Sequence, residues 1–266
     1  MHRLALSEVG IILAEPSDTQ RKIIIKQLAA ANIHQVEPVS SVEQAIQAIN
    51  KHGADLVVSA MYFEDGTGLD IIKQIKNDDF LASTPFMLVS SENRLEKLEE
   101  FKQAGVAAIL PKPFTPENLA KALKASLDLI NSDELDLELF DVHYVRVLLV
   151  DDSKLSRNHI RRVLNSLGLQ KIIESENGAQ ALTILKDNLF DLVVTDYNMP
   201  EMDGRELSEF IRFNSETAHI PIIMVTSESS SSLHMANIHQ TGVNALCDKP
   251  FEVNEVRAML ASLLGK

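Results

Sequence analysis

The sequence contains one pattern twice, and this internal repeat constrains the fold more than any other feature. The segment "GIILAEPSDTQRK" at 10–22 resembles "VLLVDDSKLSRN" at 147–158, and "DLVV" occurs at both 55 and 191. Toward the end of each copy, "PKPFTPENL" resembles "DKPFEVNEV". Because the offset stays near 136 residues, the chain is predicted to hold two tandem domains of one fold.

One part of the repeat requires a gap. The Asp-Gly pairs at 65–66 and 203–204 match only if the first copy lacks two residues after position 60, with a one-residue insertion later. On this alignment Asp65 takes the position of Asp203, at a turn that leads into a helix.

Short apolar runs alternate with amphipathic stretches in each copy. In the second copy, strands are expected at 145–150, 171–175, 191–195, 221–226 and 244–247. Helices are expected at about 154–167, 178–188, 204–214, 231–241 and 252–264. This alternation predicts an α/β fold, a buried parallel sheet with helices on both faces. The predicted domains span 1–130 and 145–266, and an acidic linker at 131–144 separates them.

Length and composition agree with two soluble domains. The 266 residues, 45% of them hydrophobic, can supply two cores. The net charge of −13 argues against direct nucleic-acid binding. No apolar run reaches the roughly 20 residues that span a bilayer, and the N-terminus lacks a signal-peptide layout, so a cytoplasmic protein without membrane insertion is expected. The single cysteine, Cys247, excludes an intrachain disulfide and is interpreted as an inert core thiol.

Polar side chains stand at the ends of the predicted strands of the second copy. They are Asp151 and Asp152 after the first strand, Asp196 at the third, Thr226 at the fourth and Lys249 after the fifth. Because the carboxyl ends of parallel strands line one crevice, these residues are expected to converge. Three close carboxylates favour a bound cation, and oxygen ligands suit Mg²⁺. A carboxylate can also attack phosphorus, which gives an aspartyl phosphate.

The second copy resembles a receiver domain of two-component response regulators. The matching motifs are "LLVDDS" (148–153), "VVTDYNMPEMDG" (193–204), "IIMVTSE" (222–228) and "DKPF" (248–251). The resemblance implies that each copy is a flavodoxin-like (βα)5 domain, with a five-stranded parallel sheet and helices on both faces.

The same resemblance implies roles for individual residues. It makes Asp196 the phosphoacceptor, Thr226 the switch hydroxyl and Lys249 the cationic partner of the phosphoryl group. It places Mg²⁺ on Asp151, Asp152, Asp196 and the backbone carbonyl of Asn198. It further implies a cis peptide bond between Lys249 and Pro250.

Three further positions affect what the resemblance implies about the phosphoryl state and the switch. Asn198 and Glu228 flank the site as in the chemotaxis regulator, which indicates a short-lived phosphoryl state. Leu246 stands where the family often has an aromatic residue that reports the switch, so the aromatic movement is not expected here.

The first copy lacks the reactive group. Ala60 takes the position of Asp196, and Pro16 takes that of Asp152. Because a methyl group cannot accept a phosphoryl group, the first domain is expected to be a degenerate receiver used for contacts. The polar residues that remain, interpreted as remnants or local structure, are Glu15, Ser90 and Lys112.

These features predict a phosphorelay signalling protein rather than an enzyme, with self-catalysed transfer and loss of the phosphoryl group. The expected partners are a histidine kinase or phosphotransfer protein and a downstream protein target. The sequence does not decide whether the chain forms a homodimer. One alternative is the regulatory segment of a longer effector such as a diguanylate cyclase, and another is a scaffold that is never phosphorylated. A phosphohydrolase is disfavoured, because Asn198 stands where that class needs a second Asp.

Overall fold

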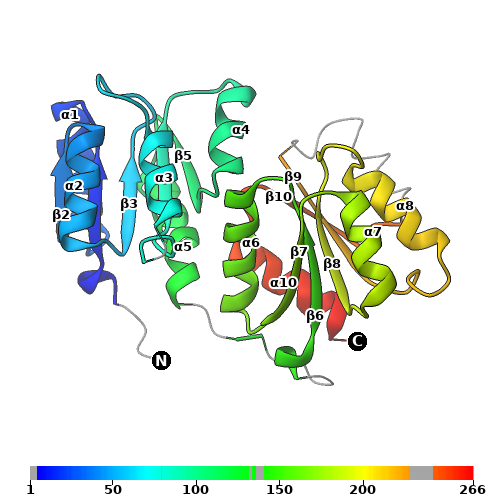
Figure 1. The fold of residues 1–266 in the computed structure, drawn as a ribbon. Coiled ribbons are helices and arrows are strands. Elements are labelled where there is room, and N and C mark those ends of the chain that lie inside the picture. The colour runs from blue at the N-terminus through cyan, green and yellow to red at the C-terminus, as the bar shows by residue number, and fades with distance from the viewer. Residues whose placement is uncertain (1–4, 79, 132–133, 136–140, 228–241, 266) are drawn as a thin grey trace. The chain divides into compact units, whose positions relative to one another are not determined.

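The structure, a computed structural model, describes residues 5–78, 80–131, 134–135, 141–227 and 242–265. The chain divides into two compact units, residues 1–131 and 132–266. Each unit contains a parallel sheet of five strands with helices around it (Figure 1), which confirms the predicted fold class. In the described part of the chain, no helix has both the length and the apolar character needed to cross a bilayer.

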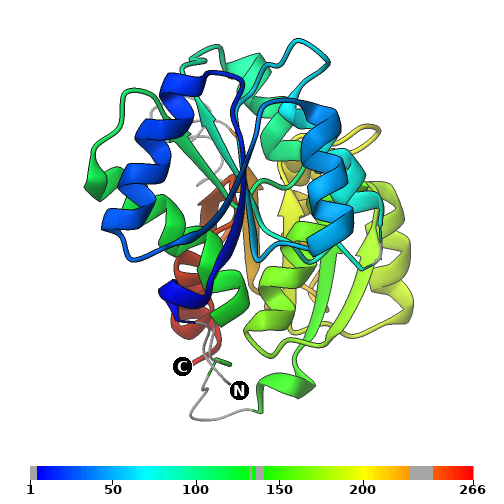
Figure 2. The same cartoon turned by 90° about the vertical axis from the view of Figure 1, so that its left-hand side faces the viewer.

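Unit 1 has the alternating order that the sequence predicts. Its elements are η1 (Leu6–Glu8), β1 (Gly10–Ala14), α1 (Asp18–Ala30), β2 (Gln35–Val39), α2 (Val42–His52), β3 (Leu56–Ser59), α3 (Gly68–Asn77), β4 (Phe86–Ser90), α4 (Leu95–Gln103), β5 (Ala108–Pro111) and α5 (Pro116–Asn131). The strands are ordered β2-β1-β3-β4-β5. Its core lies partly between the sheet and the helices α1 and α5, which cover the same face in Figure 2.

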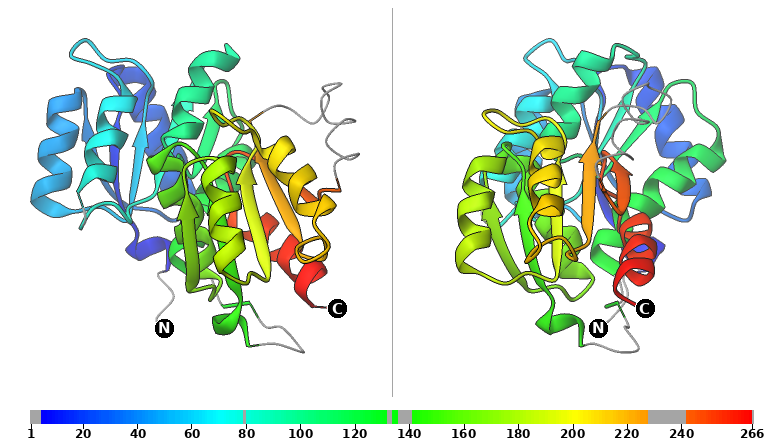
Figure 3. Two further views of the ribbon diagram at one scale, coloured as in Figure 1. Left: turned by 45° about the vertical axis from the view of Figure 1, so that its right-hand side comes forward. Right: turned by 90° about the vertical axis from the view of Figure 1, so that its right-hand side faces the viewer.

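Unit 2 repeats this order. Its elements are η2 (Val142–Tyr144), β6 (Arg146–Val150), α6 (Lys154–Ser166), β7 (Lys171–Ser175), α7 (Gly178–Asp187), β8 (Leu192–Asp196), α8 (Gly204–Phe213), β9 (Ile222–Thr226), β10 (Ala245–Asp248) and α10 (Val253–Leu264). The bounds agree closely with those predicted from the sequence. The helix predicted at 231–241 lies outside the described residues. Figure 3 shows α7 and α8 on one side of the sheet and α10 on the other.

The strand order of unit 2 indicates where a ligand crevice is expected. The sheet runs β10-β9-β8-β6-β7, so the chain continues from β6 to one neighbour, β7, and then crosses to the other, β8. Every residue of β8 and β9 is buried, as expected for central strands covered on both faces, whereas the edge strand β7 alternates. A ligand crevice forms at the carboxyl ends of the strands where the order reverses, here β6 and β8.

The structure corrects the alignment of the two copies. Gly68 donates its N–H to the carbonyl of Met61, and Gly204 donates to the carbonyl of Tyr197, both at 2.9 Å. Both glycines begin a helix eight residues after the end-of-strand position. The predicted two-residue deletion after Ala60 is therefore wrong.

Steric contact explains why Gly204 is equivalent to Gly68 and not to Gly66, the glycine of the first Asp-Gly pair. A Cβ atom on Gly204 would lie 2.1 Å from the carbonyl oxygen of Asp196, and one on Gly68 would lie 2.5 Å from that of Ala60. Asp65 instead accepts hydrogen bonds from the first two N–H groups of α2, those of Val42 and Glu43. Asp65 therefore stabilises the start of a different helix from the one Asp203 caps.

Part of the segment predicted as a linker packs on unit 2. Leu135 and Val142 are buried, and the N–H of Leu135 donates to the carbonyl of Leu167 at 2.8 Å. The ring Nδ1 of His143 lies 3.1 Å from the carbonyl oxygen of Gly168. These described residues contribute to the core of unit 2 instead of acting only as a spacer.

Candidate functional site

Two carboxylates and one ammonium group meet at the carboxyl ends of the strands of unit 2. Nζ of Lys249 lies 2.8 Å from Oδ2 of Asp196 and 3.0 Å from Oδ2 of Asp151. Asp196 ends β8, Asp151 follows β6 directly, and Lys249 follows β10. All three are buried. Residues 53 and 98 positions apart are thus brought into direct contact by the strand order.

The start of α6 holds the carboxylate of Asp151. The N–H of Ser153 donates to Oδ1 at 2.8 Å, and the hydroxyl of Ser156 donates to Oδ2 at 2.6 Å. The guanidinium of Arg157 donates to the carbonyl of Asp151 at 2.6 Å and to that of Asp152 at 3.3 Å. Contacts within unit 2 therefore hold both the side chain of Asp151 and the backbone of Asp151 and Asp152 in place.

Asp152 completes an acidic cluster with Asp151 and Asp196. One carboxylate oxygen from each of the three lies within 4.8 Å of the other two. Asp152 is exposed, whereas the other two are buried. The N–H of Tyr197 donates to Oδ1 of Asp196 at 2.8 Å, which leaves Oδ2 facing Lys249.

The charges in this cluster do not balance. The pKa of Asp196 is raised to about 6, because burial and the nearby Asp151 raise it by more than Lys249 lowers it. Burial alone would lower the pKa of Lys249, but Asp151 and Asp196 outweigh it and the pKa is raised. The cluster thus holds three carboxylates and one ammonium group. A divalent cation that prefers oxygen ligands, such as Mg²⁺, fits this donor set and its excess negative charge.

Two further predicted residues, Thr226 and Asn198, lie at or just beyond the ends of neighbouring strands. Thr226 ends β9 and is buried, and its carbonyl accepts the N–H of Lys249 at 2.7 Å. Asn198 is exposed, two residues after Asp196. The peptide bond between Lys249 and Pro250 is cis, as expected. Glu228 lies outside the described residues.

Sequence reasoning missed two residues that hold the site, Ser156 and Arg157. A signal for the arginine was present, because Arg21 stands at the same repeat position and also donates to a backbone carbonyl, that of Glu15. No such signal marked Ser156, whose counterpart is Gln20. Its contact depends on the turn between β6 and α6, which sequence spacing does not specify.

The equivalent site in unit 1 is a simple ion pair. Nζ of Lys112 lies 2.7 Å from Oε2 of Glu15, a single buried carboxylate. The hydroxyl of Ser90 accepts the N–H of Glu92 at 3.0 Å. Ala60 is buried at the end-of-strand position and offers no oxygen atom in its side chain. Unit 1 therefore keeps the lysine and one acid, without the excess negative charge of unit 2.

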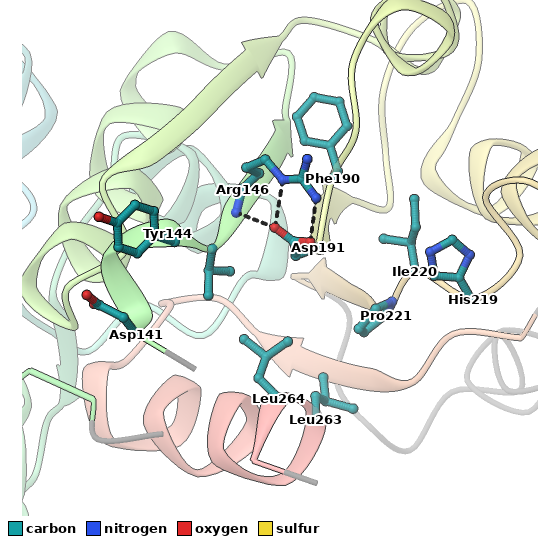
Figure 4. Close-up of a pocket in the computed structure, with 11 residues that line it drawn as sticks. Asp141, Tyr144, Arg146, Phe190, Asp191, His219, Ile220, Pro221, Leu263 and Leu264 are labelled. Atoms are coloured by element: carbon teal, nitrogen blue, oxygen red, sulfur yellow. Dashed lines mark hydrogen bonds and ion pairs between the residues drawn. The ribbon is translucent and has the colours of Figure 1, made fainter. Parts of the chain in front are cut away.

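A cavity of about 610 Å³ lies at the other end of the unit 2 sheet, beside the amino ends of β6, β8 and β9 (Figure 4). Its polar centre is the ion pair of Arg146 with Asp191, at 2.8 Å. Asp191 also accepts the N–H of Arg146 at 2.9 Å, and in unit 1 Asp55 accepts the N–H of Gly10 in the same way at 2.8 Å. The repeated contact shows that this aspartate secures the start of the first strand. The acidic cluster thus remains the candidate functional site.

The fold and the site define the class: a doubly wound α/β protein with three carboxylates and a lysine at the switch point of its sheet. Comparison with known proteins identifies the family: the chain belongs to the response regulator receiver domain family, whose model matches residues 11–124 and 147–261. Both units are receiver domains, arranged in tandem.

Individual relatives agree with this assignment. Chemotaxis protein CheY-3 of Vibrio cholerae is 36% identical over 122 residues, which are 46% of this chain and 93% of that protein. Chemotaxis protein CheY of Pseudomonas aeruginosa is 33% identical over 122 residues, 46% of this chain and 98% of that protein. Each relative thus matches a length close to that of one unit.

Solved structures with similarity to the chain include proteins of two kinds. A probable two-component system response regulator/GGDEF domain protein is 23% identical, with a TM-score of 0.44, over 96% of this chain and 98% of that one. The receiver domain of the sensor histidine kinase PA1611 from Pseudomonas aeruginosa, which has a magnesium ion in its active site cleft, is 27% identical. Its TM-score is 0.43, over 46% of this chain and 98% of that one.

Proposed function

We propose that unit 2 accepts a phosphoryl group on Asp196 in a Mg²⁺-dependent reaction, and that unit 1 is a degenerate receiver that does not. The observation that carries this proposal is the contact of the buried Asp196 carboxylate with Lys249, beside Asp151 and Asp152. This arrangement is costly for a fold to maintain, because the carboxylates repel one another in a poorly solvated site. A functional role explains why it is present.

The chain's own residues have distinct parts in the proposed transfer. A carboxylate oxygen of Asp196 attacks phosphorus, and an O–P bond forms while the P–N bond of a donor phosphohistidine breaks. The histidine nitrogen keeps the electron pair of the broken bond. The ammonium group of Lys249 stabilises negative charge on the phosphoryl oxygens, and the hydroxyl of Thr226 is the proposed partner of one of them.

Mg²⁺, when bound, neutralises charge in the acidic cluster and on the phosphoryl oxygens. Its proposed protein ligands are Asp151, Asp152, Asp196 and the backbone carbonyl of Asn198. Asp151 is already oriented by the Ser153 N–H and the Ser156 hydroxyl. Asp152 is exposed, so it can turn toward an incoming ion.

The proposed donor is a histidine kinase or a phosphotransfer protein, and the proposed output is a protein contact that changes on phosphorylation. On this view the chain is a signalling phosphoacceptor that catalyses its own modification, and not an enzyme with a separate substrate. Unit 1 cannot be modified in the same way, because Ala60 replaces the nucleophile. We therefore assign unit 1 a role in contacts.

Acetyl phosphate with Mg²⁺ provides a direct test that needs no cognate kinase. The wild-type chain is expected to gain the mass of one phosphoryl group, and chelation of Mg²⁺ should prevent the gain. Asp196→Asn removes the nucleophile and should abolish the modification. An unmodified wild-type protein, or equal modification of Asp196→Asn, would contradict the proposed function.

A further inference from the structure

We propose that Ser156 is a positioning residue for the Mg²⁺ site of unit 2, in that its hydroxyl holds the Asp151 carboxylate ready to bind the ion. The inference rests on the proposed function and adds a residue to it. Ser156 lies in the first turn of α6, and it is not one of the proposed ligands.

The contact itself is short and buried. The Ser156 hydroxyl donates to Oδ2 of Asp151 at 2.6 Å, a length typical of a charge-assisted hydrogen bond. Only 3% of Ser156 and 0% of Asp151 is exposed, so water does not compete for the bond. The backbone of Ser156 is also anchored, because its N–H donates to the Ser153 hydroxyl at 3.3 Å. The donor therefore has little freedom to move away.

Unit 1 provides a comparison within the same chain. Glu15, at the position of Asp151, accepts the N–H of Ser17 at 3.0 Å and pairs with Lys112. These contacts match those that Ser153 and Lys249 make in unit 2. The position of Ser156 is Gln20, and among the described residues Glu15 receives no hydrogen bond from its side chain. The hydroxyl contact is thus specific to the unit that keeps the three carboxylates.

The chemistry of the donor explains why a hydroxyl suits this position. Oδ2 of Asp151 is shared between Ser156 and Lys249. An ammonium group repels a divalent cation bound nearby, whereas a neutral hydroxyl does not. Ser156 can therefore keep Asp151 oriented while Mg²⁺ is bound, at no electrostatic cost. Hydrogen bonds that orient a metal ligand typically change metal affinity by about 10- to 100-fold when they are lost.

Calorimetric titration of the full chain with Mg²⁺ tests the inference. Ser156→Ala is expected to weaken Mg²⁺ binding about tenfold. Ser156→Thr and Ser156→Val have nearly the same shape but differ in the hydroxyl, so the Thr variant should bind more tightly than the Val variant. Ser208→Ala is the matched control, because it removes another buried hydroxyl, whose one hydrogen-bond partner among the described residues is the carbonyl of Gly204, at 2.8 Å. It should leave the affinity unchanged.

The outcomes separate this inference from the proposed function. If the wild-type chain does not bind Mg²⁺, the proposed function itself fails. If the wild type binds and Ser156→Ala binds equally well, Ser156 has no positioning role and the proposed function stands. Equal weakening in Ser156→Ala and Ser208→Ala, or equal affinity of the Thr and Val variants, would also contradict the inference. The Thr–Val pair decides the question if the Ala variant does not fold.

Discussion

The ammonium nitrogen of Lys249 lies 2.8 Å from Oδ2 of Asp196, in a region that solvent hardly reaches. In unit 1, Lys112 lies 2.7 Å from Oε2 of Glu15. The lysine after the fifth strand is thus a counter-ion for buried acid in both receiver domains. Only in unit 2 is it part of a cluster with more negative charge than it can neutralise, and this difference distinguishes the candidate site of unit 2 from the equivalent position in unit 1.

Replacing Lys249 with Met is expected to destabilise unit 2 in the absence of metal. The substitution leaves Asp151 and Asp196 buried without their cation, and breaking a buried pair typically costs about 3–5 kcal/mol. Mg²⁺ should restore part of this loss. Urea denaturation in chelator and in Mg²⁺ measures both effects. Lys112→Met is the control, and a Mg²⁺-dependent recovery of equal size there would contradict the interpretation.

A side chain on Gly204 would collide with the backbone of Asp196. In Gly204→Ala the new Cβ would lie 2.1 Å from the carbonyl oxygen of Asp196, so the chain must shift. We expect a loss of about 1–3 kcal/mol in unfolding free energy and slower phosphorylation by acetyl phosphate. In Gly10→Ala the Cβ would meet its nearest atom, on Asp55, at 3.4 Å, so a much smaller loss is expected. Equal losses would show that contact with Asp196 is not the cause.

Arg212 connects three segments of unit 2 near the amino ends of β9 and β10. Its guanidinium donates to the carbonyls of Ala218, Ile220 and Gly242 and to the side chain of Asn244. Arg212→Ala is expected to cost about 2–3 kcal/mol, because several backbone acceptors lose a charged donor.

The control for Arg212 lies on the same helix. Arg205 makes an exposed ion pair with Glu209 one turn away, so Arg205→Ala should cost less than about 0.5 kcal/mol. Urea denaturation at neutral pH compares the two variants. A similar cost for both would mean that the network around Arg212 does not stabilise the unit.

Asp191 is expected to stabilise unit 2 in a pH-dependent way. Its hydrogen bond with the Arg146 side chain holds the pKa of Asp191 below its ordinary value of 3.8. A carboxyl group with a lowered folded-state pKa contributes stability above the unfolded-state pKa, and this stability is lost as the pH falls through the folded-state value. The pair is partly exposed, so the contribution should stay below about 1 kcal/mol.

Asp191→Asn isolates the charge, since an amide oxygen can still accept the N–H of Arg146. The wild type should be more stable than this variant at neutral pH, and the difference should shrink below about pH 4. Urea denaturation at several pH values measures it. A difference that does not change with pH would show that the charge of Asp191 contributes nothing.

Cys247 is expected to be unreactive in the folded chain. The thiol is fully buried in β10, and burial raises its pKa well above the usual range, so very little thiolate forms at neutral pH. A disulfide reagent at about pH 8 should modify Cys247 only after denaturant is added. Rapid modification of the native protein would contradict the interpretation of an inert core thiol.

Much of the fold could be read from the sequence because its signals are local. The runs "LVVTD" and "IIMVT" are continuously apolar until their last one or two residues, as central strands of a parallel sheet must be. The same runs end in Asp196 and Thr226, so the strand pattern also located the candidate site. Two copies of one pattern supported each other, and the comparison of Asp196 with Ala60 distinguished them.

Other features depend on distances that no local pattern encodes. The match of Asp-Gly at 65–66 with 203–204 was wrong, because the close approach of Gly68 and Gly204 to the preceding strand, and not the dipeptide, defines equivalent positions. The packing of Leu135 and Val142 on unit 2 likewise follows from contacts with residues distant in the chain.

The sequence alone determined that this protein has two α/β domains, that the second has three acids and a lysine at its strand ends, and that the first has Ala60 at the position of Asp196. Only the tertiary structure decided which atoms meet: Lys249 between Asp151 and Asp196, and the Ser156 hydroxyl on Asp151. The reason is physical. The burial pattern of a strand follows from the residue type at each position. The 2.6 Å hydrogen bond from Ser156 to Asp151 depends instead on where the whole sheet places a turn and a helix.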